Sequence, residues 1–301
     1  MDTRTAHLTA GTVLLSAALC VLGLCALRHV RNPYMHMRQM QALFVRLDVG
    51  FALYVLLFYT RVIFIEDPVF EPISQCLFSI LEGVTIFTFF NMMLLLVGGT
   101  AAAVGHMKQN NDETNDNWLL SPCKITLDRF RSRIIVFVIL KPILAAVDGW
   151  AVNQQARNPL TDSYRIVHSA LAVVMVTLTV LTFLGVLRTY KELKAHISGS
   201  FKLTAKFLVV KGMLLLSTLQ WSLANAIVRH WTTSELYMYS TICVAESLLL
   251  AVVYFFVFTA QEPDVPHLDS DAAPFRVASA FAVWDLFEYP VGKDVTYAAA
   301  L

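Results

Sequence analysis

The sequence predicts an all-α membrane protein, a seven-transmembrane helical bundle with the N-terminus outside and the C-terminus in the cytoplasm. Three observations lead to this prediction: seven long apolar stretches, an alternation of basic residues between them, and a mean hydropathy of +0.60. Of the 301 residues, 57% are hydrophobic and only 15% are charged. This composition excludes an ordinary soluble domain, because such a domain needs a polar surface.

Each apolar stretch is close to the ~20 residues that a helix needs to cross a ~30 Å hydrocarbon core. The predicted spans cover residues 9–27, 43–65, 74–97, 132–150, 165–187, 205–228 and 237–260. The first stretch is too long for the apolar core of a secretory signal and carries its positive charges after it, so we expect it to stay in the membrane. The expected domains are a seven-helix transmembrane domain over residues 1–260 and a cytoplasmic tail over residues 261–301.

The orientation follows from the basic residues in the gaps between spans. The even-numbered gaps hold only Arg157 and Arg229. The odd-numbered gaps hold Arg28, Arg31, Arg38, Lys108, Lys124, Arg129, Arg131, Arg188, Lys191, Lys194 and Lys202. By the positive-inside rule the odd gaps are cytoplasmic. A net charge of +1 without a clustered basic face argues against a nucleic-acid partner.

The five cysteines show neither a disulfide framework nor the spacing of metal ligands, and we expect no metal or cofactor. They are Cys20, Cys25, Cys76, Cys123 and Cys243. Cys123 lies beside Lys124 in the longest predicted cytoplasmic loop, where either S-acylation or a plain loop cysteine fits. In the same loop, residues 107–117 are polar and predict a solvated segment.

The tail contains a short amphipathic segment. Val277, Phe281, Trp284 and Phe287 fall at offsets that place them on one face of a helix. That face could lie on the inner leaflet or pack against the cytoplasmic ends of the bundle.

Ionisable residues inside the spans are the first candidates for function, since a charge at a helix centre costs ~2.5 to 3.5 kcal/mol on insertion scales. Those near span ends can extend to the interface, and we interpret them as structural: Arg46, Arg61, Arg133, Arg165 and Lys206. The deeper ones are Glu82, Lys141, Asp148, Lys211 and Glu246. Lys141 and Glu246 each lie about 14 Å from one end of their spans. We therefore favour their pairing, with Lys211 as the other candidate partner of Glu246.

Polar residues extend these charges into stripes along single helix faces. The stripes are Thr204, Lys211, Thr218, Ser222 and Asn225 in the sixth span; Gln75, Ser79, Glu82 and Thr85 in the third; and His168, Thr179 and Thr182 in the fifth. Each stripe alone could serve helix packing, and His168 alone could be structural. Together they favour a wet interior that admits a solute.

The predicted site therefore consists of charged residues deep in the spans and of polar residues from these stripes. Its substrate-binding residues are Lys141, Lys211, Glu82, Glu246, Thr218, Ser222, Asn225 and His168. In this hypothesis the two lysines attract an anion and the two glutamates are their counter-charges. Pro142 would free the carbonyl of Val138 beside Lys141, and Gly98-Gly99 would end the third helix.

At these residues the chain resembles the organic solute transporter subunit alpha / transmembrane protein 184 family, over residues 29–262. The resemblance rests on Tyr190-Lys-Glu-Leu193, Lys206-Phe-Leu-Val-Val-Lys211, Gln220-Trp221, Glu82 ahead of Gly98-Gly99, Lys141-Pro142, His29-x-x-Asn32 with Gln39, and Cys243 with Glu246. Gln220-Trp221 is reversed relative to the family, Cys243 and Glu246 are one residue further apart, and the proline before Lys206 is absent. A divergent member is indicated.

The resemblance implies a facilitative transporter of amphipathic organic solutes such as steroid-conjugate anions, in the plasma membrane or an endosomal or vacuolar membrane. It also implies a single-pass partner subunit, with a homo-oligomer as the other possibility. The alternatives are a seven-helix receptor and a trafficking or scaffold protein. A receptor is disfavoured because the third span ends in Leu-Val-Gly-Gly rather than an Asp-Arg-Tyr-like triplet. An enzyme is not expected, because no protease or hydrolase motif is present.

The predicted orientation can be checked with introduced glycosylation acceptors. An acceptor inserted between Ala151 and Tyr164 should be modified, because that gap is predicted to be outside, and one between Met107 and Asn117 should not. A gel-mobility shift removed by endoglycosidase is the measurement. Modification of the second site alone would reverse the topology.

Overall fold

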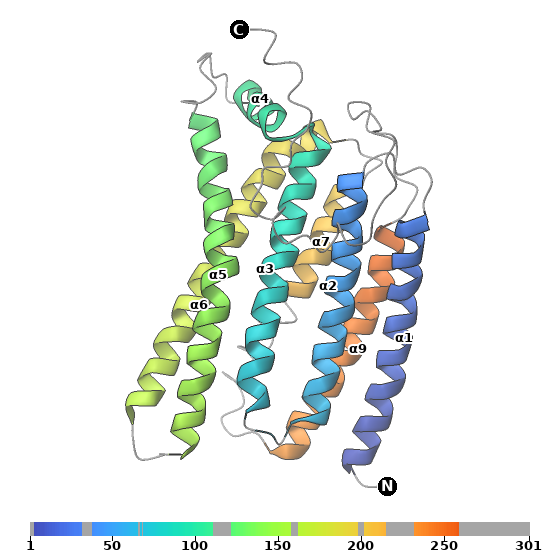
Figure 1. Cartoon of the computed structure of the whole chain (residues 1–301), viewed down its shortest axis with the longest axis vertical. Helices are drawn as coiled ribbons and strands as arrows, with labels where there is room; N and C mark the ends of the chain where they lie inside the picture. The colour runs from blue at the N-terminus through green and yellow to red at the C-terminus, as the bar shows by residue number, and fades with distance from the viewer. Residues whose placement is uncertain are drawn as a thin grey trace.

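The computed structural model describes residues 3–31, 38–65, 67, 69–110, 122–157, 162–197, 202–214 and 232–258, and these residues are almost entirely helical (Figure 1). The helices are α1 (Thr3–Arg31), α2 (Arg38–Ile63), α3 (Phe70–Leu96), α4 (Thr100–Asn110), α5 (Pro122–Arg157), α6 (Asp162–Leu193), the short 3-10 helix η1 (Lys194–His196), α7 (Leu203–Leu214) and α9 (Thr233–Val257).

Within the described part of the chain, six helices are long and apolar enough to cross a membrane: α1, α2, α3, α5, α6 and α9. The prediction of an all-α membrane protein is therefore confirmed. The predicted sixth span, residues 205–228, begins in α7, but residues 215–231 lie outside the described residues. The count of seven spans and the orientation stay predictions, and the tail segment from Val277 to Phe287 also lies outside the described residues.

The fourth and fifth spanning helices are longer than their apolar spans. α5 begins at Pro122 rather than at residue 132, and α6 extends to Leu193 rather than 187. Hydropathy marks only the membrane-embedded part of a helix, whereas the backbone hydrogen bonds continue into polar turns. Cys123 consequently lies in the first turn of α5 with 6% of its surface exposed, so its predicted position in a loop is wrong. A buried thiol is a poor acceptor for S-acylation.

Gly98 and Gly99 end α3, as predicted. Both have positive φ, +94° and +97°, which side chains with a Cβ rarely adopt. The Gly99 N–H donates to the carbonyl of Leu94 and the Gly98 N–H to that of Leu95, the pattern of a Schellman motif. The chain then turns into α4, which lies across the end of the bundle (Figure 1).

α4 corrects the prediction of a solvated loop at 107–117. Residues 107–110 are helical, and Met107 is buried together with Ala103 and Val104. These three apolar residues form one face of α4, and this face packs the otherwise polar helix onto the bundle. Residues 111–117 lie outside the described residues.

α3 lies at the centre of the bundle. Its apolar window is 83% buried, against 22% for α1 and 17% for α6. It packs most extensively on α5, and also contacts α2, α6 and α7; α1, α2 and α9 pack on one another beside it. The peripheral helices expose large apolar side chains, among them Leu249, Phe256, Val173 and Ile166. Such an outer surface matches hydrocarbon rather than water.

Two glycines bring α3 and α5 unusually close. A Cβ at Gly83 of α3 would lie 3.0 Å from the Cα of Val138 in α5, and a Cβ at Gly149 of α5 would lie 2.7 Å from the Cα of Pro72 in α3. Small residues permit such close helix approach in membranes. The two helices therefore approach closely at both of these points.

Gly149→Ala should lower the free energy of unfolding by about 1 to 3 kcal/mol, because the added methyl group would overlap the backbone of Pro72. Thermal unfolding of the purified protein in detergent measures this. The matched control is Gly23→Ala in α1, where a Cβ meets nothing within 4 Å; it should be neutral or slightly stabilising. Equal stability of the two variants would contradict the close approach.

Candidate functional site

A buried ion pair joins the two central helices. The Lys141 ammonium on α5 donates to the Glu82 carboxylate on α3, and only 3% of Lys141 and 1% of Glu82 are exposed. The Lys141 ammonium also lies 5.0 Å from the centre of the Phe137 ring, a cation–π distance. Gly83, next to Glu82, allows the approach of the helices that lets this short contact form. Opposite charges thus compensate each other inside the bundle.

The sequence analysis favoured a different partner for Lys141, because it compared only the depths of the charged residues along their helices. Lys141 was expected to meet Glu246, but the ion pair that the structure places on Lys141 is with Glu82. Glu246 is on α9, which packs chiefly on α1, α2 and α7, whereas α5 packs chiefly on α3 and α6. Depth along a helix does not determine which helices are neighbours.

The stripe on α3 is half-buried at Gln75, buried from Ser79 onward, and longer than predicted. From Ser79 it continues at intervals of three residues: Ser79, Glu82, Thr85, Thr88 and Asn91, all at most 5% exposed. The Thr88 hydroxyl and the Asn91 side-chain carbonyl are buried without a hydrogen-bond partner among the described residues. Unsatisfied buried polar atoms cost about 1 to 3 kcal/mol each. A row of polar groups therefore runs through the centre of an apolar bundle.

The predicted stripe of the sixth span is only partly described. Thr218, Ser222 and Asn225 lie outside the described residues. Lys211 is half-buried on α7, with its ammonium 5.7 Å from the centre of the Phe183 ring. Thr204 is exposed and its hydroxyl lies 2.7 Å from that of Tyr190 on α6. The family-like segments at Tyr190 and Lys206 are thus brought together.

Two residues assigned to the interface are instead buried. Lys206 has no exposed surface, and its ammonium lies 5.8 Å from the Phe44 ring and 5.6 Å from the Phe258 ring. Arg61 is 8% exposed, with its guanidinium 5.9 Å from the Phe78 ring. The structural interpretation assumed that side chains near span ends reach the interface. Both side chains are instead packed inside the bundle.

α5 and α6 share a second acid–base contact. His168 Nδ1 lies 2.7 Å from Asp148 Oδ1; the histidine side chain is 41% exposed and the aspartate 5%. The other two residues of the fifth-span stripe form hydrogen bonds to the backbone of their own helix. The hydroxyls of Thr179 and Thr182 donate to the carbonyls four residues earlier. A role of this stripe in contacting a solute stays a prediction.

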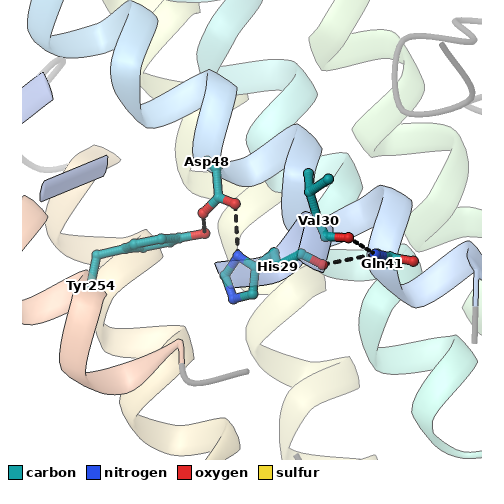
Figure 2. A network of polar contacts seen from close by, with 5 residues as sticks. All are labelled: His29, Val30, Gln41, Asp48 and Tyr254. Carbon is teal, nitrogen blue, oxygen red and sulfur yellow. Dashed lines mark hydrogen bonds and ion pairs between the residues drawn. The ribbon is translucent and has the colours of Figure 1, made fainter. Parts of the chain in front are cut away.

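A network that the sequence analysis missed joins α1, α2 and α9 (Figure 2). His29 Nδ1 lies 2.7 Å from one oxygen of Asp48, and the Tyr254 hydroxyl donates to the other at 2.7 Å. The Gln41 amide donates to the carbonyls of His29 and Val30. The residue that could have revealed this network from the sequence is Asp48, because it places a carboxylate inside the predicted span 43–65.

Comparison with known families decides what kind of protein carries these sites. The family model described as organic solute transporter Ostalpha matches residues 6–263. The chain belongs to the organic solute transporter Ostalpha family. The predicted resemblance is confirmed, over more of the chain than the motifs alone indicated. No curated protein and no solved structure matches it.

Membership of the Ostalpha family makes the chain a solute-transporter-type, integral multi-pass membrane protein. The family is a transporter family rather than an enzymatic one.

Removing one member of the central ion pair should destabilise the protein more than removing both. Glu82→Gln and Lys141→Met should each lower the free energy of unfolding by about 3 to 5 kcal/mol, because each leaves one buried charge uncompensated. The double variant should recover a large part of this loss. Thermal unfolding of the four proteins measures the coupling.

The control for this cycle is Lys124 and Asp128, a partly exposed pair one turn apart on α5. Its coupling should be about 0.3 to 0.5 kcal/mol. Additive effects of the Glu82 and Lys141 substitutions would show that the two groups do not depend on each other.

Proposed function

We propose that this chain is a facilitative transporter of amphipathic organic anions, of the steroid-conjugate type. The observation that carries the proposal is the family match over residues 6–263. The buried polar row on α3 supports it, because intramembrane polar and charged groups commonly mark solute paths. An amphipathic solute needs both a polar contact for its head group and an apolar surface for its body, and the bundle has both.

Lys211 is the proposed anion-attracting group. The charge of Lys141 is already compensated by Glu82, so this pair holds α3 and α5 together beside the path. Lys211 is half-buried and lies near the Phe183 ring, so a charged and an aromatic surface adjoin there. Glu246 is proposed as a counter-charge, and the lining is proposed to include Thr218, Ser222, Asn225 and His168.

The membrane context is also part of the proposal. The basic gaps support an orientation with the N-terminus outside, in the plasma membrane or an endosomal or vacuolar membrane. A single-pass partner subunit, or a second copy of this chain, would pack on the apolar outer surface. Among the six candidate spanning helices that the structure describes, α6 has the smallest buried share, so it offers such a surface.

The decisive experiment is uptake by vesicles containing the purified protein. A labelled panel of amphipathic anions, uncharged analogues and amphipathic cations is offered with and without a co-expressed single-pass subunit. Uptake of anions down their gradient, without an imposed ion gradient, is expected. Absence of uptake of every anion, under both conditions, would contradict the proposal.

In this assay Lys211→Ala should reduce anion uptake about tenfold or more, since a hydrogen bond to a charged group contributes about 1.5 to 3 kcal/mol. Lys211→Arg should retain part of the activity. The matched control is Lys191→Ala on α6, where the lysine is exposed. Normal uptake by a well-folded Lys211→Ala protein would remove Lys211 from the site.

A further inference from the structure

The outer side of α5 and α6 carries an exposed apolar stripe along each helix. On α5 the stripe recurs at intervals of three or four residues, each 38–54% exposed: Val136, Leu140, Ile143 and Val147. On α6 it comprises residues that are 45–66% exposed: Val173, Val180, Leu181 and Leu184. In a bilayer such stripes contact the acyl chains of lipids, which are as apolar as these side chains.

At one end of the pair, both stripes lead into basic residues. Arg133 and Arg129 lie three and seven residues before the α5 stripe begins, so they are on its face. Arg188 and Lys191 lie four and seven residues after Leu184, the last apolar residue of the α6 stripe. All four basic side chains are exposed. They are within four residues of the ends of the predicted apolar spans, the depth at which lipid head groups lie.

The basic residues of the two helices are on the same side of the pair. The helices run antiparallel (Figure 1), and Phe130 of α5 packs on Gly185 of α6, where an added Cβ would lie 3.3 Å from the ring. Arg133 follows Phe130 by three residues, and Arg188 follows Gly185 by three. In an antiparallel pair, equal offsets from a mutual contact lead to the same side, because a two-fold axis relates the helices there. Val138, which faces α3, is on the other side of α5.

These four basic side chains form no ion pair in the part of the chain that the structure describes. Asp128, the acidic residue next to Arg129, bonds Lys124 instead. The Arg133 guanidinium lies 5.9 Å from the centre of the Phe130 ring, at the contact between the helices. The positive-inside rule accounts for basic residues at this end of the helices. It does not account for their position in line with two exposed apolar stripes.

We propose that this side of α5 and α6 binds a phospholipid with a multiply charged anionic head group. Its acyl chains lie along the two apolar stripes, and its phosphates are held by Arg129, Arg133, Arg188 and Lys191. Three of these residues are arginines, whose planar guanidinium groups match the oxygens of a phosphate in pairs. Basic pockets between transmembrane helices are a recurrent site for such lipids. The predicted orientation places the head group in the cytoplasmic leaflet, which carries anionic lipids.

The test measures lipid binding to the full-length protein, purified in mild detergent without a partner subunit so that no other protein occupies this side. Phosphatidylinositol bisphosphate, phosphatidylserine and phosphatidylcholine with the same acyl chains are titrated, and bound copies are counted by native mass spectrometry. Phosphatidylinositol bisphosphate should bind most tightly and phosphatidylcholine least. Equal affinity for these two lipids would overturn the proposal.

Variants on each helix test whether the two sets of charges act together. Arg129→Gln on α5 and Arg188→Gln on α6 should each weaken binding of the bisphosphate lipid about fivefold, and the double variant about 25-fold. The matched control is Arg31→Gln, which removes an exposed arginine at the same end of the bundle but on α1 (Figure 1). It should bind within about twofold of wild type. An equal loss in Arg31→Gln would show attraction by overall charge instead of a site.

Two further measurements separate a lipid site from other anion sites. Inositol trisphosphate has the phosphates but no acyl chains, so it should bind much more weakly than the lipid; equal affinity would contradict the role of the apolar stripes. Lys211→Ala should bind the lipid as wild type does, because Lys211 belongs to the proposed solute path on α7. No transport is measured, so the result does not depend on whether anions are carried across the membrane.

Discussion

The compensation of charge inside an apolar bundle is the constraint on which the arrangement of this protein depends. Glu82 and Lys141 can be buried only because α3 and α5 approach closely enough for them to meet, and Gly83 and Gly149 provide that approach. A single unpaired charge at this depth would cost several kcal/mol. The same requirement explains why Asp48 is bonded by groups from two other helices.

Much of the fold follows from hydropathy, because a spanning helix must be long and apolar whatever its neighbours are. Six of the seven predicted spans correspond to long helices in the described residues. Hydropathy could not predict α4, whose few apolar residues form a face only after Gly98 and Gly99 turn the chain. It also could not predict where the helices end, since polar turns continue α5 and α6 beyond their apolar spans.

The candidate site was harder to predict because position along a helix gives depth but not direction. Glu82 and Lys141 were both singled out, yet the favoured partner of Lys141 was on another helix. Lys206 was assigned to the interface because it lies near a span end, although its face points into the bundle. The contact between His29 and Asp48 joins the end of one span to the start of the next. Only the packing of α1 on α2 reveals it.

The turn at Gly98 and Gly99 also restricts how the bundle can move. α4 lies across the end of the helices with a buried face (Figure 1), so a shift of α3 along its axis would carry α4 away from the residues on which it packs. Piston-like sliding of α3 is therefore disfavoured. Rearrangement during transport would involve tilting of the peripheral helices around a central helix that keeps its height in the bilayer.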